Sequence, residues 1–172
     1  LIHNTLVGLG VRDQIRIGAS GKIVSAFDMA RVIAMGADWC NSARGFMFAL
    51  GCIQAQACHT GHCPTGVTTQ DPVRQQALVV PDKAQRVANF HRETLVSLMD
   101  MVGAAGLTHP KDITADHILR RIDANNIAPL SALLPSISEG ALLRATEDPT
   151  DWPPVFRNFW HRATPESFSL QA

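Results

Sequence analysis

The first 51 residues combine two kinds of apolar pattern. Apolar positions three and four residues apart predict helices, and short apolar runs bounded by glycine predict strands. Ser25 is a candidate helix cap, and Gly10 and Gly36 are candidate helix ends. The expected helices are residues 2–9, 25–35 and 43–51, and the expected strands are residues 15–18 and 37–40. Helices and strands that alternate with short connections are typical of parallel βα units.

The next segment, residues 52–81, has no apolar periodicity and is rich in glycine and proline. We predict a long ordered loop here, and loops of this length inside a compact domain are usually functional. Asp82 is the predicted cap of a helix of about 24 residues. Its expected buried stripe is Val87, Phe90, Leu95, Leu98 and Val102.

The last part of the chain has weaker signals. Thr114 is expected to cap a shorter helix that runs through Ile122. From Glu147 onward prolines interrupt any pattern, and four aromatic residues give this tail apolar anchors: Trp152, Phe156, Phe159 and Trp160. The predicted organisation is therefore two βα units (1–51), a cysteine loop (52–81), a helical region (82–146) and an irregular tail (147–172).

Composition and charge narrow the functional classes. The chain has 172 residues, with 15 basic and 15 acidic side chains. It lacks the excess of positive charge that would indicate binding to nucleic acid or to an anionic membrane. The sequence contains no run of about 18 apolar residues, so we expect no membrane-spanning helix. The chain begins with Leu1 inside an apolar pattern, without the features of a signal peptide. We therefore expect a fragment of a cytoplasmic protein.

Four cysteines occur, and three of them lie within twelve residues in the pattern C-x5-C-x4-C, followed directly by Pro64. Cys52, Cys58 and Cys63 can each bind a separate iron of one iron–sulfur cluster. Zinc is an alternative in which His59 and His62 complete the ligand set, although their spacing matches no common zinc finger. Three buried free cysteines are the remaining interpretation.

The segments after the two predicted strands are candidate anion sites. Ser20, Gly21 and Lys22 follow the first strand, and residues 41–45, which include Ala43 and Arg44, follow the second. Glycine allows an anion to approach the backbone closely, and the basic side chains add charge-assisted hydrogen bonds. Small residues after strands are also ordinary turn chemistry, so these segments alone do not decide the matter.

Residues 15–72, with the cysteine spacing and the run CPTGVTTQ, resemble the FMN-binding synthase domain of glutamate synthases, in particular the stand-alone FMN-binding members that lack a glutaminase domain. The likeness continues through residues 78–95 and fades after about Leu143. It implies an α/β fold in which this chain is the C-terminal part, about strands seven and eight with flanking helices, of a (β/α)8 TIM barrel. An added helical region would follow.

The resemblance also implies cofactors. Cys52, Cys58 and Cys63 match the ligands of a 3Fe–4S cluster, while Cys40 matches no ligand and is expected to be structural. Two turns match the family's loops after strands seven and eight, so the expected FMN phosphate ligands are Ser20, Gly21, Lys22, Ala43 and Arg44. Lys22 replaces a family glycine, and Ala43 and Arg44 are also larger than the family pattern, so the phosphate geometry can differ.

The implied function is that of an oxidoreductase, in which electrons pass from the cluster to FMN and reduce 2-iminoglutarate, formed from 2-oxoglutarate and ammonia, to glutamate. The electron donor would be ferredoxin or an NAD(P)H-dependent subunit. The strands that would contact substrate are missing here, so no catalytic residue is assigned. The chain would need an upstream half of the barrel, a partner chain or self-association. Two other functions stay open: a redox-inactive module stapled by a metal, and a truncated remnant.

Overall fold

A computed structural model describes residues 1–144 and 152–167 of the chain. Its contacts divide the chain into two compact units. The first consists of residues 18–117, and the second combines residues 1–17 with the segment from residue 118 onward. The observed parallel strand pair and the cysteine loop both lie in the unit of residues 18–117, which is therefore the one that carries the candidate sites.

Two βα units open the unit of residues 18–117. Its elements there are β1 (Gly18–Ser20), α2 (Ala26–Ala34), β2 (Trp39–Asn41) and α3 (Arg44–Leu50). The two strands pair in parallel, with Gly18 opposite Trp39 and Ser20 opposite Asn41. This confirms an α/β arrangement with parallel strands. Each strand pairs with only one neighbour among the described residues, so the sheet has two strands.

The predicted cap of α2 is confirmed. The Ser25 hydroxyl accepts a hydrogen bond from the Asp28 amide at 3.2 Å, and the Asp28 carboxylate accepts one from the Ser25 amide at 2.9 Å. This reciprocal pair satisfies backbone amides that have no partner inside the helix. The strands lie one to three residues later along the chain than expected. The ends of a strand depend on which residues pair with the neighbouring strand, and the apolar run in the sequence does not reveal this.

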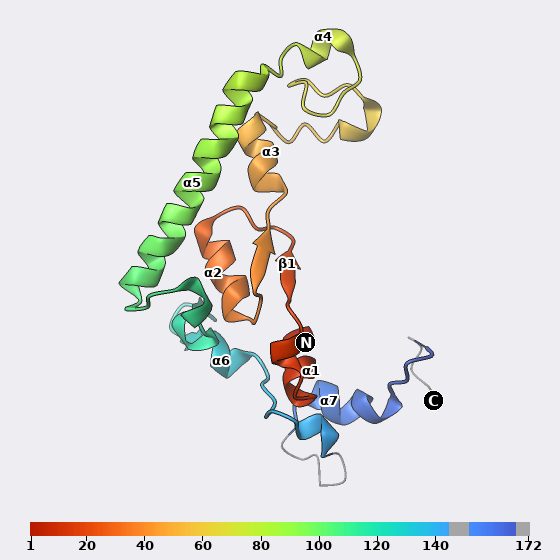
Figure 1. Ribbon diagram of the computed structural model, residues 1–172, viewed down its shortest axis with the longest axis vertical. Coiled ribbons are helices and arrows are strands. Elements are labelled where there is room, and N and C mark those ends of the chain that lie inside the picture. The colour runs from red at the N-terminus through yellow and green to blue at the C-terminus, as the bar shows by residue number, and fades with distance from the viewer. Residues whose placement is uncertain (145–151, 168–172) are drawn as a thin grey trace. The chain divides into compact units, whose positions relative to one another are not determined.

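The long helix α5 (Val80–Ala104) lies along α2 and α3, as Figure 1 shows. It starts before the predicted cap: Val79 is the N-cap, Pro81 occupies the first turn and Asp82 follows inside the helix. Proline is tolerated there because an amide in the first turn needs no helical partner. The approach of α3 to α5 is close, since a Cβ at Gly45 would lie 2.8 Å from the Phe90 ring.

The predicted stripe of α5 is partly wrong. Leu98 and Val102 are buried as expected, but Leu95 is 41% exposed. Positions 90, 94, 98 and 102 are four residues apart, so Thr94 takes the place assigned to Leu95. Its hydroxyl donates to the Phe90 carbonyl at 2.7 Å and is thereby satisfied inside the helix. The unit ends with the short helices η3 (Pro110–Asp112) and η4 (Ala115–His117), both beside α2.

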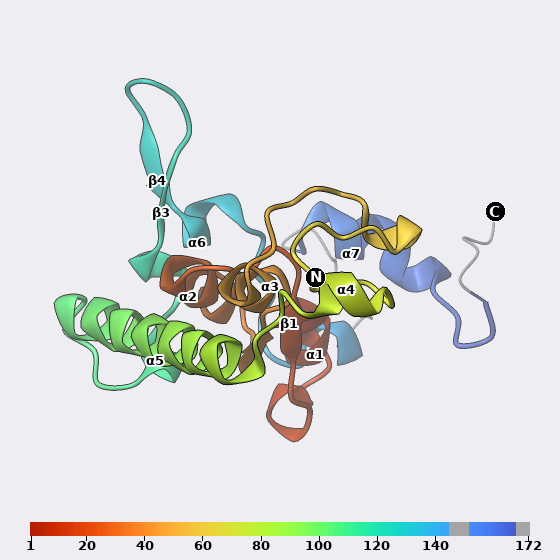
Figure 2. The ribbon, with the colours of Figure 1, turned by 90° about the horizontal axis from the view of Figure 1, so that it is seen from above.

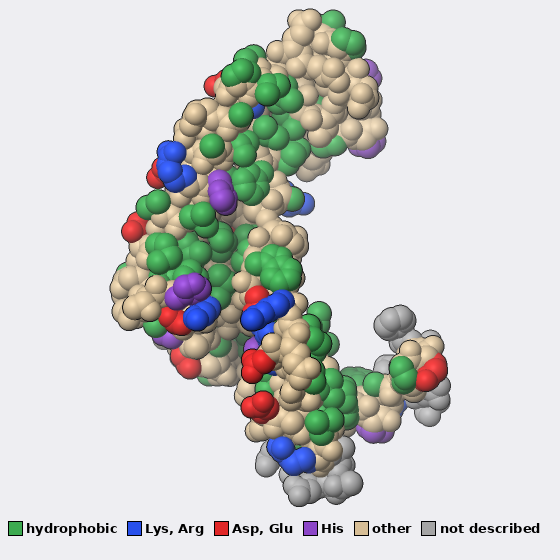
Figure 3. All heavy atoms as spheres, in the orientation of Figure 1, with side chains coloured by type: hydrophobic (Ala, Val, Ile, Leu, Met, Phe, Trp, Pro, Cys, Tyr) green, Lys and Arg blue, Asp and Glu red, His purple; other side chains and the backbone are tan. Residues whose placement is uncertain are grey.

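Apolar side chains remain exposed on this unit. Figure 3 shows hydrophobic side chains spread over the surface of the α2 and α5 region. The exposed ones include Phe27, Trp39, Leu95, Val96 and Met99. Large exposed apolar patches are typical of surfaces that contact further protein.

The second unit starts with α1 (Ile2–Gly8) and η1 (Arg12–Gln14). The helix predicted from Thr114 to Ile122 is wrong: beyond η4 the chain forms β3 (Leu119–Arg121), which pairs antiparallel with β4 (Ile127–Pro129), as seen in Figure 2. The Asp123 carboxylate accepts hydrogen bonds from the amides of Asn125 and Asn126 and so reverses the chain. This side-chain turn favours a hairpin over a continued helix.

The remaining elements of that unit are short. They are α6 (Leu130–Leu133), η5 (Ala141–Leu143), α7 (Pro154–Phe159) and η7 (Trp160–Arg162). Gly8 packs against Leu142, and Phe156 is buried as one of the predicted aromatic anchors. Phe159 is exposed, and residues 147–151 and 168–172 of the predicted tail lie outside the described residues. No helix of the described residues is long and apolar enough to cross a membrane.

Candidate functional site

The cysteine loop connects α3 to α5 and contains η2 (Cys58–Thr60) and α4 (Pro72–Gln75). Gly51 ends α3 in the left-handed conformation, with φ of 107°. Gly61 and Gly66 both have φ of 75°, which glycine adopts without steric cost. A Cβ at Gly66 would collide with the backbone carbonyl oxygen of Arg74, whereas the space around Gly61 is open. The loop therefore folds tightly back on itself at Gly66.

Thr69 is the central hydrogen-bonding residue of this loop. Its hydroxyl donates to the Gly61 carbonyl and accepts from the Asp71 amide at 3.1 Å. The Gln75 side chain donates to the Thr69 carbonyl at 3.0 Å. Asp71 in turn caps α4 by accepting from the Val73 amide at 2.8 Å. All these partners belong to the loop, so the loop is held by its own residues.

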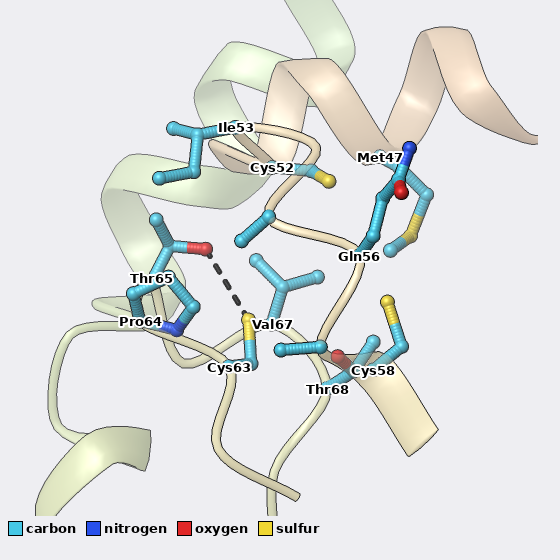
Figure 4. A pocket seen from close by; sticks show the side chains of 12 residues that line it. Met47, Cys52, Ile53, Gln56, Cys58, Cys63, Pro64, Thr65, Val67 and Thr68 are labelled. Carbon is cyan, nitrogen blue, oxygen red and sulfur yellow. Dashed lines mark hydrogen bonds between the residues drawn. The ribbon is translucent and has the colours of Figure 1, made fainter. Parts of the chain in front are cut away.

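The three loop cysteines line one pocket, together with apolar side chains such as Met47 and Val67. Figure 4 shows their sulfur atoms around the same space. All three are free thiols; Cys63 is buried, Cys52 is half-buried and Cys58 is exposed. The sequence thus places three soft sulfur donors around a common pocket, as the C-x5-C-x4-C spacing suggested.

Hydrogen bonds make Cys63 unusually acidic. The Thr65 hydroxyl, 3.5 Å from the sulfur, and the backbone amides of Thr68 and Thr65 lower the pKa of the Cys63 thiol to about 6. Each of these donors stabilises the thiolate, which is the form that binds metal. Burial instead raises the pKa of the Cys40 thiol, the cysteine outside the loop. The thiol of Cys63 is therefore more readily ionised than that of Cys40.

The donors do not converge on a single ion. In the ranges 1–144 and 152–167, no three His, Cys, Asp or Glu side chains lie close enough together to hold one metal ion. His59 and His62 are exposed and do not line the pocket. An iron–sulfur cluster needs no such convergence, because each thiolate binds a different iron atom. The residues present therefore fit a cluster better than a zinc ion.

The two turns predicted to bind phosphate lie at the same edge of the sheet. Ser20 is the last residue of β1, Asn41 is the last of β2, and the two are opposite each other in a parallel pair. The Ser42 hydroxyl donates to the Ile23 carbonyl at 2.6 Å and links the two turns. The sequence predicted that residues of both turns bind one phosphate, but it gave no sign that Ser42 links the two turns.

All five predicted phosphate residues are exposed: Ser20, Gly21, Lys22, Ala43 and Arg44. Gly21 and Lys22 have φ of 104° and 56°, and nothing lies within 4 Å of a Cβ placed on Gly21. Their turn is therefore an open, left-handed bend that includes the basic residue Lys22. Such backbone curvature can direct amide groups toward an anion.

The Asp28 carboxylate limits which amides an anion can reach. It accepts hydrogen bonds from the Ser25 amide, the Ser25 hydroxyl and the Val24 amide, and these lower the pKa of Asp28. The start of α2 thus already holds a negative charge. No side chain caps α3, so the turn that contains Ala43 and Arg44 lacks such an internal anion.

Comparison with known proteins identifies relatives of this chain. Residues 1–108 match a protein family described as a conserved region in glutamate synthase. A glutamate synthase large subunit-like protein of Bacillus subtilis, YerD, is 38% identical over 134 residues, which cover 78% of this chain and 26% of that protein.

Two other relatives carry more specific names. An archaeal glutamate synthase [NADPH] of Methanocaldococcus jannaschii is 38% identical over 57% of this chain and 19% of its own length. A ferredoxin-dependent glutamate synthase of Arabidopsis thaliana is 34% identical over 65% of this chain and 8% of its own length. The chain thus spans about a quarter or less of these relatives.

Proposed function

Because the chain belongs to the glutamate synthase family, we propose that it is the cofactor-binding part of an oxidoreductase that makes glutamate. In this proposal, ammonia and 2-oxoglutarate form 2-iminoglutarate and water, and the C=N bond then takes up two electrons and two protons. When bound, a 3Fe–4S cluster supplies single electrons and FMN supplies the two-electron reduction of the imine. The residues of this chain bind and position these two groups.

The observation that carries the proposal is the shared pocket of Cys52, Cys58 and Cys63. Their side chains would hold the three iron atoms, and the low pKa of Cys63 favours the thiolate that binding needs. The apolar residues of the pocket would shield the sulfur atom of Cys63, the buried one of the three, from water. The internal hydrogen bonds of Thr69 and Asp71 would hold the three ligands in place.

For FMN, we propose that the phosphate lies at the joined ends of β1 and β2. Ser20, Gly21, Lys22, Ala43 and Arg44 would surround it, with backbone amides and two cationic side chains as donors. The carboxylate of Asp28 directs the phosphate away from the amides of Val24 and Ser25.

The parallel pairing of β1 and β2 supports placing these strands as the seventh and eighth of a (β/α)8 barrel. The substrate and the flavin ring would then contact strands outside this chain. The exposed apolar surface over α2 and α5 also favours contact with an upstream half of the barrel or a partner chain. The names of the relatives suggest ferredoxin or an NADPH-dependent partner as electron donor.

The test is reconstitution of the complete protein with iron and sulfide in the absence of oxygen. We expect about three iron atoms per chain and the EPR signal of an oxidised 3Fe–4S cluster. Cys58→Ser should lose most of the iron, while Cys40→Ser is the matched control and should keep it. With reduced ferredoxin or NADPH, the wild-type protein should form glutamate from 2-oxoglutarate and ammonia.

Stoichiometric zinc in the purified protein, with no iron retained after reconstitution, would favour the metal-stapled module instead. Iron retention equal in the Cys58→Ser and Cys40→Ser variants would show that the ligands are assigned wrongly. A stable cluster without any glutamate formation would restrict the proposal to electron transfer.

A further inference from the structure

Two threonine hydroxyls lie among the residues that line the cysteine pocket, those of Thr65 and Thr68. The Thr65 hydroxyl lies 3.5 Å from the sulfur of Cys63, as the dashed line in Figure 4 marks. The Thr68 hydroxyl oxygen is buried and has no hydrogen-bond partner in the described part of the chain. The Thr68 hydroxyl also lowers the pKa of the Cys63 thiol, but less than any other group that acts on this thiol.

The unpaired state of Thr68 distinguishes it from its neighbours. The hydroxyl of Thr60 donates to the Ala57 carbonyl at 2.8 Å, and the hydroxyl of Thr69 donates to the Gly61 carbonyl. Buried hydroxyls are satisfied in most native proteins because leaving one without a partner is unfavourable. A buried, unpaired hydroxyl in a pocket lined by three thiols therefore indicates an acceptor that occupies this pocket.

We infer that Thr65 and Thr68 donate hydrogen bonds to sulfur atoms of the bound cluster or of its cysteine ligands and thereby raise the reduction potential of the cluster. This inference rests on the proposed function. Neither residue binds iron, so both are positioning residues that act through the sulfur atoms.

The physical basis is the change in charge on reduction. One added electron, supplied by the electron donor, makes the sulfur atoms more negative and therefore better hydrogen-bond acceptors. A hydroxyl that donates to them stabilises the reduced form more than the oxidised form, and hydrogen bonds to the sulfurs are one of the known determinants of cluster potentials. The effect is strongest at the buried Cys63, because less water competes for its sulfur atom there.

The experiment is an anaerobic redox titration of the reconstituted complete protein with dithionite, followed by EPR. Thr65→Val and Thr68→Val remove the hydroxyl at nearly constant side-chain size. We expect each to lower the equilibrium constant for one-electron reduction about threefold to tenfold, where tenfold corresponds to about 59 mV. Thr94→Val is the matched control, since its hydroxyl is bonded within α5 and it does not line the pocket.

Thr68→Ser tests the hydroxyl directly, because it keeps the donor and removes only the methyl group. A wild-type potential in Thr68→Ser supports the inference. This holds even when Thr68→Val retains no cluster at all. The inference is overturned if Thr68→Ser behaves like Thr68→Val, or if both valine variants assemble a cluster with the wild-type potential. In either case the proposed function stands, whereas a wild-type protein that assembles no cluster overturns both.

Discussion

The cysteine loop and the two strand-end turns differ in how much of their surroundings this chain provides. The loop is held by hydrogen bonds between its own residues, and its pocket is lined entirely by residues 47–68. The turns end two three-residue strands, and all five candidate phosphate residues are exposed. We therefore expect the loop to form the proposed cluster site without further protein, and the proposed flavin site to need strands from elsewhere.

The largest effect is expected from disrupting the loop at Gly66. Gly66→Ala should reduce the free energy of unfolding by about 3–5 kcal/mol, because the new Cβ collides with the Arg74 backbone. Gly61→Ala is a matched control with the same φ of 75° but open space, and should lose only about 1–2 kcal/mol. Urea unfolding measures both. Equal losses in the two variants would mean that the loop does not pack as described.

The turns are tested by FMN affinity in the complete protein. Gly21→Asp should weaken FMN binding about tenfold or more, because it places a carboxylate beside the phosphate and hinders close approach to the backbone. Gly106→Asp is the control, since Gly106 also has a positive φ and open surroundings but follows α5. Flavin fluorescence quenching gives both affinities. An unchanged affinity in Gly21→Asp would show that the phosphate lies elsewhere.

A smaller effect, specific to the cysteine loop, is expected in how the stability of the metal-free protein depends on pH. Folding lowers the pKa of the Cys63 thiol from about 9 to about 6. The thiolate therefore stabilises the folded, metal-free protein fully above pH 9, and this stabilisation is lost as the pH falls through about 6. Denaturation of the metal-free protein should show a rise in stability from pH 6 to 9 that is absent in Cys63→Ser. If stability depends on pH in the same way in both proteins, the Cys63 thiolate is not the cause of the rise.

The sequence indicated that the three cysteines lie on one loop because its signals are local. The spacing of three cysteines and the following Pro64 indicate the chemistry without any knowledge of distant contacts. The cap of α2 was also readable, since Ser25 and Asp28 are three residues apart. Thr65 and Thr68 were missed because threonine is common in turns. A hydroxyl two residues after Cys63, a predicted ligand, was the signal that could have pointed to Thr65.

Elements whose position depends on contacts between distant residues could not be predicted in the same way. The sequence after Thr114 is compatible with a helix until the side-chain turn at Asp123 brings β4 back to β3. The position of β1 was misplaced for a similar reason, because Ser20 belongs to the strand only through its partner Asn41. Leu95 was misassigned because a polar residue, Thr94, satisfies its hydroxyl inside the helix and can therefore face inward.

The most direct test of the contrast between loop and turns is to measure iron and FMN binding together on the 172-residue chain alone. After anaerobic reconstitution we predict about three iron atoms per chain. We expect FMN binding only in the millimolar range, about −4 kcal/mol, because the ring lacks its apolar walls. Submicromolar FMN binding would contradict the account, and so would a chain that circular dichroism shows to be folded but that retains no iron.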